Sequence, residues 1–262
     1  MNRTRLFDAL RGSTLFKGRL AQPQVDGINA ILDSAGRNGL KDIHHVSNVL
    51  AQVYRETGGN MLGIKETVMP HHKDKNPSDA TVIARLDRAW KAGKLGKVRT
   101  PYWRDGAFGR GPIQLTHWAN YIKFGKRLGI DLRKNPERAL EPAIGADIAV
   151  IGMKEGMFRK FGLSDYRFPA DLDNPPETNP RRIVNGKDGA DKEVARNHRI
   201  FHGALMAAGW GKADKPAAPA PAEQSKERQA PAQPWPRASG AKLAAAVALL
   251  VIAAVLATIF GG

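Results

Sequence analysis

No cysteine occurs among the 262 residues, which excludes a disulfide framework and a thiolate metal site and agrees with a reducing compartment. The stretch 1–21 contains basic residues but no apolar run long enough for a signal peptide, so nothing there directs secretion. Negative charge is scarce, because 25 acidic residues face 41 lysines and arginines, for a formal net charge of +16. This charge favours a polyanionic partner such as a cell-wall polymer or anionic lipid. Specific nucleic-acid binding is not expected, because no recognition motif accompanies the charge.

The composition changes after Trp210. Residues 212–242 are rich in proline and alanine without apolar periodicity, which predicts a disordered linker. Residues 243–260 carry no charge and are almost entirely Ala, Val, Leu and Ile, which predicts a transmembrane helix. A buried or self-associating helix is the alternative, but no further domain follows the linker to bury it. Basic residues precede this segment and none follow it, so the charge rule places residues 1–211 on the cytoplasmic side of the membrane.

Apolar residues recur at helical spacing through most of the first 211 residues, and period-two stretches are few. The sequence therefore predicts a mainly α domain. The expected helices cover about 24–36, 43–57, 79–92, 117–128, 139–157 and 191–208.

The helix expected over 43–57 carries a carboxylate at its end. Its apolar stripe, with the i, i+3, i+4, i+7 spacing of one helical face, continues to Glu56 and consists of Val46, Val49, Leu50 and Val53. Gly58-Gly59 predicts the helix stop. Apolar surroundings and the negative end of the helix dipole favour the protonated carboxyl that a general acid needs. Periodicity alone leaves open a frayed helix end with a solvated glutamate.

A second informative segment is the run Gly109-Arg110-Gly111-Pro112-Ile113-Gln114-Leu115-Thr116. Glycines let the backbone approach a sugar closely, proline stiffens a turn, and Gln and Thr side chains offer uncharged hydrogen-bonding groups. Together with Arg55-Glu56-Thr57-Gly58-Gly59, this run resembles the active-site signature of family 19 glycoside hydrolases. That family contains chitinases and the lysozyme-like endolysins of bacteriophages.

A third segment agrees with this resemblance. Ile183-Val184-Asn185-Gly186, followed by Arg199, is similar to the family's Ile-Asn-Gly turn and the arginine on the next helix. The chain departs from the pattern at Tyr54-Arg55, where a histidine usually precedes the glutamate. The resemblance spans about residues 25–210 and implies a two-lobed lysozyme-like fold with a substrate cleft between helical lobes.

The resemblance also implies inverting hydrolysis of a β-1,4 glycosidic bond, which needs a second carboxylate about 6.5–9.5 Å from the acid to activate water. Glu66, in Gly63-Ile64-Lys65-Glu66-Thr67-Val68, is similar in position to the base of phage-type members and is the expected base. Asp105, just before the signature run, is the alternative base. A solvated Glu66 paired with Lys65 or Lys73 is the alternative without a catalytic role.

The remaining site residues follow from the same resemblance. Thr116 is expected to help the base position the water, and substrate is expected to bind to Gln114, Asn120 and Asn185. Tyr102, Trp103 and Trp118 are candidates for stacking on sugar rings, with a place in the core as the alternative.

Two arginines, Arg110 and Arg199, are expected to orient carboxylates by charge-assisted pairing. We expect no cofactor. We also expect no metal site, because His198 and His202 have helical chelating spacing but no third ligand.

The sequence therefore predicts a monomeric peptidoglycan hydrolase, a phage or prophage endolysin, held at the host inner membrane until lysis. A bacterial family 19 chitinase is the alternative within the same chemistry, although neutral chitin gains nothing from the basic surface. A catalytically silent, membrane-tethered wall-binding protein is the alternative of another class.

Overall fold

The computed structural model describes residues 1–68, 73–74, 76–96 and 98–211. Cα packing divides the chain into two units, Met1–Lys215 and Pro216–Gly262. The linker expected over 212–242 and the hydrophobic helix expected over 243–260 lie outside the described residues. Among the residues that are described, no helix has both the length and the apolar character needed to cross a membrane.

The described part of the chain is mainly helical, which confirms the prediction of a mainly α domain. Its α-helices are α1 (Arg3–Arg11), α2 (Gln22–Arg37), α3 (Ile43–Glu56), α4 (Asp79–Lys91), α5 (Trp118–Leu128), α6 (Pro142–Lys154) and α7 (Asp191–Ala207). Two short strands are β1 (Ile64–Lys65) and β2 (Arg110–Gly111). The 3-10 turns are η1 (Tyr102–Asp105), η2 (Pro136–Leu140), η3 (Leu163–Asp165), η4 (Ala170–Asp173) and η5 (Pro180–Ile183).

The six expected helices correspond to α2 through α7, with ends that differ by at most three residues. Helix α1 was not expected. The Asn2 side chain caps it by accepting the backbone N–H of Arg5 at 3.0 Å, and the helix buries Leu6 and Leu10. A helix this short presents only two core residues, too few for periodicity to reveal it.

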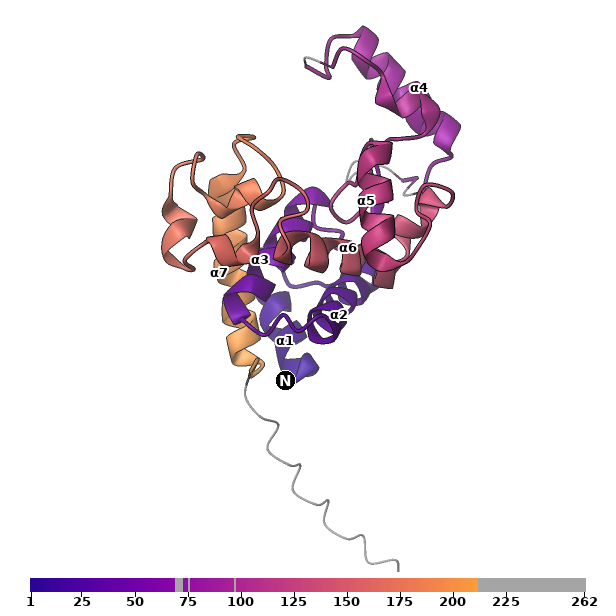
Figure 1. Ribbon diagram of the computed structural model, residues 1–262. Coiled ribbons are helices and arrows are strands. Elements are labelled where there is room, and N and C mark those ends of the chain that lie inside the picture. Colours follow the sequence, from indigo (N-terminus) through magenta and orange to yellow (C-terminus); the bar gives the residue numbers. More distant parts are fainter. Residues whose placement is uncertain (69–72, 75, 97, 212–262) are drawn as a thin grey trace, which may run out of the picture. The chain divides into compact units, whose positions relative to one another are not determined.

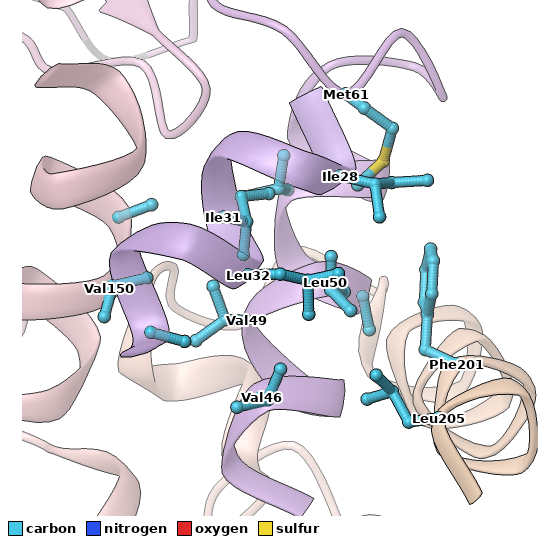
Figure 2. Packing of buried hydrophobic residues seen from close by; sticks show 14 of the residues in the cluster. Ile28, Ile31, Leu32, Val46, Val49, Leu50, Met61, Val150, Phe201 and Leu205 are labelled. Atoms are coloured by element: carbon cyan, nitrogen blue, oxygen red, sulfur yellow. The ribbon is translucent and has the colours of Figure 1, made fainter. Parts of the chain in front are cut away.

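The main hydrophobic core surrounds α3. Figure 1 shows α3 between α7 on one side and α2 with α6 on the other, and these helices pack against one another. Figure 2 shows the contact, where Val46, Val49 and Leu50 of α3 lie among apolar side chains of α2, α6 and α7. These three valine and leucine side chains are fully buried. Burial on several sides fixes the orientation of α3, and therefore of its last residue, Glu56.

Both ends of α3 are set by local chemistry. At its start, the Asp42 side chain accepts the backbone N–H groups of His44 at 2.7 Å and His45 at 3.1 Å, as an N-cap does. At its end, Gly58 and Gly59 have φ angles of 58° and 83°, a left-handed conformation that favours glycine. The expected helix stop is confirmed.

The two strands form a short antiparallel ladder in which Ile64 pairs with Gly111 and Lys65 pairs with Arg110. A separate apolar cluster lies under α4 and η1 and contains Val82, Leu86, Trp103 and Phe108. The ladder brings the segment after α3 against the signature run of residues 109–116.

Candidate active site

Glu56 is the last residue of α3, and its side chain is only 14% exposed. The expected apolar stripe is buried, but Glu56 does not lie in apolar surroundings. Its Oε1 accepts a hydrogen bond from Nη2 of Arg181, which comes from η5. The frayed, solvated helix end left open by periodicity is therefore wrong, and the carboxyl is held by an ionic contact instead.

Arg181 is the centre of this contact and is 3% exposed. Besides Glu56, its guanidinium binds Oδ2 of Asp188 at 2.7 Å and Oε1 of Gln52 at 2.6 Å. Burial alone would raise the pKa of Asp188, but hydrogen bonds and charge from Arg181 lower it. Arg181 therefore contacts two carboxylates, Glu56 and Asp188, through the same guanidinium.

Gln52 lies one helical turn before Glu56 on the same face of α3 and is fully buried. Its Nε2 donates to the backbone carbonyl of Pro180 at 3.1 Å, while its Oε1 accepts from Arg181. Gln52 thus binds both the backbone and the guanidinium of η5. The sequence alone did not predict a role for Arg181, Asp188 or Gln52. The only signal was the pair Arg181-Arg182 next to the turn that resembles the family.

Glu66 follows β1 and is held by neutral donors. The Tyr102 hydroxyl donates to its Oε1 at 2.8 Å, and the backbone N–H of Gly109 donates to its Oε2 at 2.7 Å. The backbone N–H of Glu66 in turn donates to the Gly109 carbonyl at 2.7 Å. Burial raises the pKa of Tyr102, and the adjacent Glu66 raises it further, so Tyr102 remains a proton donor to the carboxylate.

The alternative in which Glu66 pairs with Lys65 is wrong. The Lys65 ammonium binds Asp79 at 2.9 Å and Glu137 at 3.0 Å instead. Consecutive residues of an extended segment point to opposite faces, which separates the two side chains. Glu66 is therefore free of this lysine and faces the signature run.

The signature run holds its own shape through Gln114. Its Nε2 donates to the carbonyls of Ile64 at 2.9 Å and Gly111 at 3.0 Å, which fastens the run to β1. A Cβ at Gly109 would lie 2.7 Å from Oε1 of Gln114, so a larger residue there would require the Gln114 side chain to shift. The Gln114 amide nitrogen, expected to bind substrate, is thus engaged with backbone.

Thr116 and Asn120 lie beside this glycine. The γ-methyl of Thr116 lies 3.2 Å from the position of a Cβ on Gly109, whose N–H binds Glu66. Asn120 donates to the Thr116 carbonyl at 2.8 Å. Both side chains are partly exposed, and Thr116 lies next to the glycine whose N–H binds Glu66.

The two arginines expected to orient carboxylates pair with neither Glu56 nor Glu66. Arg110 is 1% exposed and binds Glu137 at 2.7 Å and Asp79 at 2.8 Å, with its guanidinium 3.7 Å from the Phe108 ring centre. Arg199 pairs on the surface with Asp173 at 2.6 Å. Arg110 therefore anchors β2, and the arginine beside Glu56 is Arg181.

The aromatic candidates have different positions. Trp103 is fully buried against Trp90, and its indole N–H binds Asp87 at 2.8 Å. The expectation that Trp103 binds sugar is wrong, because its ring forms part of the core under α4. Tyr102 uses its hydroxyl to hold Glu66, and Trp118 is half-buried beneath the Arg133 guanidinium at 3.7 Å.

Two polar candidates serve local turns. Asp105 is exposed, and its carboxylate accepts the backbone N–H of Ala107 at 3.3 Å. Asn185 is also exposed; its Oδ1 accepts the N–H of Gly186 at 2.7 Å and its Nδ2 donates to Asp188 at 3.3 Å. Through Asp188, the turn that carries Asn185 is connected to Arg181 and Glu56.

The histidines considered as metal ligands stack instead. His44 lies parallel to His202 with ring centres 4.3 Å apart, and His44 Nδ1 is 3.2 Å from His198 Nε2. Over residues 1–211, apart from the undescribed positions, no cluster of three or more histidine, aspartate or glutamate side chains has a geometry suited to a metal ion.

No protein-family model matches the chain. Solved structures with a similar arrangement include chitinase C from Streptomyces griseus, with 19% identity, a TM-score of 0.47 and coverage of 79% of this chain and 76% of that one. Another is a bacterial family 19 chitinase, with 18% identity, a TM-score of 0.45 and coverage of 78% and 94%. The second belongs to the family that the motifs resemble. Likeness of this degree does not define an activity.

Proposed function

We propose that the chain is a chitinase-like glycoside hydrolase that cuts the glycan strands of peptidoglycan by inverting acid/base hydrolysis. One observation carries the proposal: each of the two expected carboxylates is held by a residue in or next to a segment that resembles the family signature. Gly109 of the signature run binds Glu66, and Arg181 beside the Asn185 turn binds Glu56. Pairs of carboxyl groups in different environments are the usual means of dividing acid and base roles.

In the proposed reaction, Glu56 gives its proton to the glycosidic oxygen as the bond to the anomeric carbon breaks. Water attacks that carbon from the opposite face, and Glu66 takes the proton that the water loses. Thr116, adjacent to the Gly109 that binds Glu66, holds this water through its hydroxyl without competing for its proton. The sugar lies in the cleft between lobes that the resemblance implies.

Charge favours peptidoglycan over chitin as the substrate. Residues 212–242 account for +3 of the formal charge of +16, so +13 belongs to the rest of the chain. Peptidoglycan and its attached polymers carry negative charge, whereas chitin is neutral and gains nothing from a basic surface. A bacterial chitinase remains the alternative with the same chemistry, since either substrate presents a β-1,4 bond.

We further propose that the protein acts as a phage or prophage endolysin and that residues 243–260 tether it to the host inner membrane. The support is their composition alone. If this is so, full-length protein sediments with membranes and resists extraction by high salt, because salt screens charge but leaves apolar burial in place. Release by salt alone would assign the attachment to the basic surface.

The experiment for the proposed activity compares turnover of purified peptidoglycan and of soluble chitin oligomers, followed by mass spectrometry of the released muropeptides. We expect cleavage of peptidoglycan, and the new reducing end identifies which of the two glycosidic bonds is cut. Activity on chitin alone would replace the proposal with the chitinase alternative. Binding to cell walls without any turnover would favour the catalytically silent protein.

A further inference from the structure

A pocket of about 610 Å³ lies in the segment between α6 and η5. Its wall includes the cations Lys160, Arg167 and Arg182 and the aromatic rings of Phe161 and Tyr166. A volume of this size matches sites for ligands of several residues, rather than for a single small ion. Nothing in the proposed hydrolysis uses this pocket.

The charges of the pocket are arranged so that cations face the solvent. The two aspartates in its wall are engaged with backbone: Asp171 is 7% exposed and accepts the N–H of Arg167 at 2.7 Å, and Asp165 accepts the N–H of Gly162 at 2.8 Å. The Arg167 side chain, by contrast, is 90% exposed, with its guanidinium 3.6 Å from Asp171. Lys160 is also exposed. Asp165 is exposed as well, so the wall carries three cations against two carboxylates and has a net positive charge.

Arg182 gives the pocket a stacked, oriented donor. Its guanidinium lies 4.3 Å from the ring centre of Phe161, and its Nη1 donates to the Glu177 carbonyl. Stacking of this kind holds a guanidinium in a fixed plane and suits it to paired recognition of a carboxylate. The pocket thus combines one stacked cation with two exposed ones.

The pocket begins one residue away from the candidate active site. Arg181 and Arg182 are consecutive in η5, with Cα atoms about 3.8 Å apart. Arg181 points to Glu56, and Arg182 lines the pocket. Through η5, the wall of the pocket is therefore continuous in the chain with the contact that holds Glu56.

Resting on the proposed function, we propose that this pocket binds the short acidic peptide attached to the glycan strand, and thereby selects peptidoglycan over chitin. Peptidoglycan carries such peptides on alternate sugars, whereas chitin carries none. Carboxylates of the peptide pair with Lys160, Arg167 and Arg182, since charge-assisted bonds to guanidinium are short and directional. Its apolar groups lie on the faces of Phe161 and Tyr166.

The test uses the full-length double variant Lys160→Gln/Arg167→Gln, in which amides replace two exposed cations. The matched control is Arg88→Gln/Lys91→Gln, which removes the same charge from exposed positions on α4. Two substrates are compared: peptide-bearing glycan strands, and the same strands stripped of peptide by an amidase. For the pocket variant we expect KM to rise on the order of 3- to 10-fold on peptide-bearing strands only, as for exposed charge pairs. The control should not distinguish the two substrates.

An equal loss on both substrates, or no loss on either, would overturn this inference. Failure of the proposed function has a different signature, because the wild-type chain would then cut neither kind of strand.

Discussion

Glu56 and Glu66 are anchored in opposite ways. Glu56 ends a long helix packed inside the main core, and a buried guanidinium holds it. Glu66 follows a two-residue strand, and a phenol hydroxyl and a backbone N–H hold both of its oxygens. Two chemically identical carboxyl groups are therefore held by different means: an ionic contact holds Glu56, and neutral hydrogen-bond donors hold Glu66.

The contacts that hold Glu56 also extend over more of the molecule than those that hold Glu66. On α3, the polar residues His44, Asn48, Gln52 and Glu56 recur every four positions along one face, and Arg181 binds two of them. The Glu66 anchor is confined to the short ladder, Tyr102 and Gly109. Changes near Glu56 should therefore affect both stability and activity, and changes near Glu66 should affect mainly activity.

The largest effect is expected from Glu56→Gln and Glu66→Gln. Each should lower kcat about 10²- to 10⁴-fold, because an amide neither gives nor takes the proton. Circular dichroism should show an unchanged fold. Asp105→Asn is the matched control, with near wild-type rates expected. If that variant is inactive and Glu66→Gln is active, Asp105 is the base.

Arg181→Gln should be the most destabilising change at the site. Breaking a buried ion pair leaves Glu56 and Asp188 without their counter-charge, which costs about 3–5 kcal/mol. Arg199→Gln removes an equal charge from an exposed pair and should cost about 1 kcal/mol or less. Urea unfolding of both variants measures the difference. Similar losses would mean that the buried contact does not anchor Glu56.

We expect low pH to reduce the stability of the packing between α3 and α7 before that of other parts of the described structure. Burial, followed by the charges of His44 and His202, lowers the pKa of His198 from 6.5 to about 3. Between pH 6.5 and about 3, His198 therefore binds a proton in the unfolded chain but not in the folded chain. Its contribution to the free energy of unfolding is fully present above pH 6.5 and is lost as the pH falls from 6.5 toward 3.

The measurement is the unfolding temperature as a function of pH for wild type and His198→Gln, which lacks the titrating group. The variant should show a flatter dependence in this window. An unchanged profile would mean that His198 does not drive the acid sensitivity.

A smaller effect is expected from Tyr102→Phe. This variant removes one of the two hydrogen bonds to Glu66 and should lower kcat about 10-fold, the value of a hydrogen bond to a charged group. Its unfolding free energy should change little. Tyr54→Phe is the matched control, since its hydroxyl binds the Leu15 carbonyl at 2.9 Å, away from Glu66. If kcat fell in Tyr54→Phe and not in Tyr102→Phe, the hydrogen bond from Tyr102 to Glu66 would not support catalysis.

The sequence predicts local features of this fold well. Helices α2 to α7 follow from apolar periodicity, and the end of α3 follows from Gly58-Gly59. The strands β1 and β2 could not be predicted, because two residues each carry no period-two signal. They exist because Gln114 and Gly109 tie the signature run to the segment around Glu66.

The site residues that the sequence did not predict are brought there by contacts between positions far apart in the sequence. Arg181 lies 125 positions after Glu56, and no local pattern marks which of the 41 lysines and arginines contacts Glu56. Trp103 shows the opposite error, a core residue that was assigned to substrate binding. A tryptophan beside a signature motif can equally well pack in the core or stack on a sugar ring. The fully buried indole decides for the core.

The central claim is inverting hydrolysis by Glu56 and Glu66, and the anomeric form of the fresh reducing end tests it most directly. Proton NMR during cleavage of solubilised glycan strands resolves the two anomers before they equilibrate. We predict that the α-anomer appears first, because water attacks a β-linked sugar from the opposite face. First appearance of the β-anomer would contradict the account, since it requires a covalent intermediate and a different role for the second carboxylate.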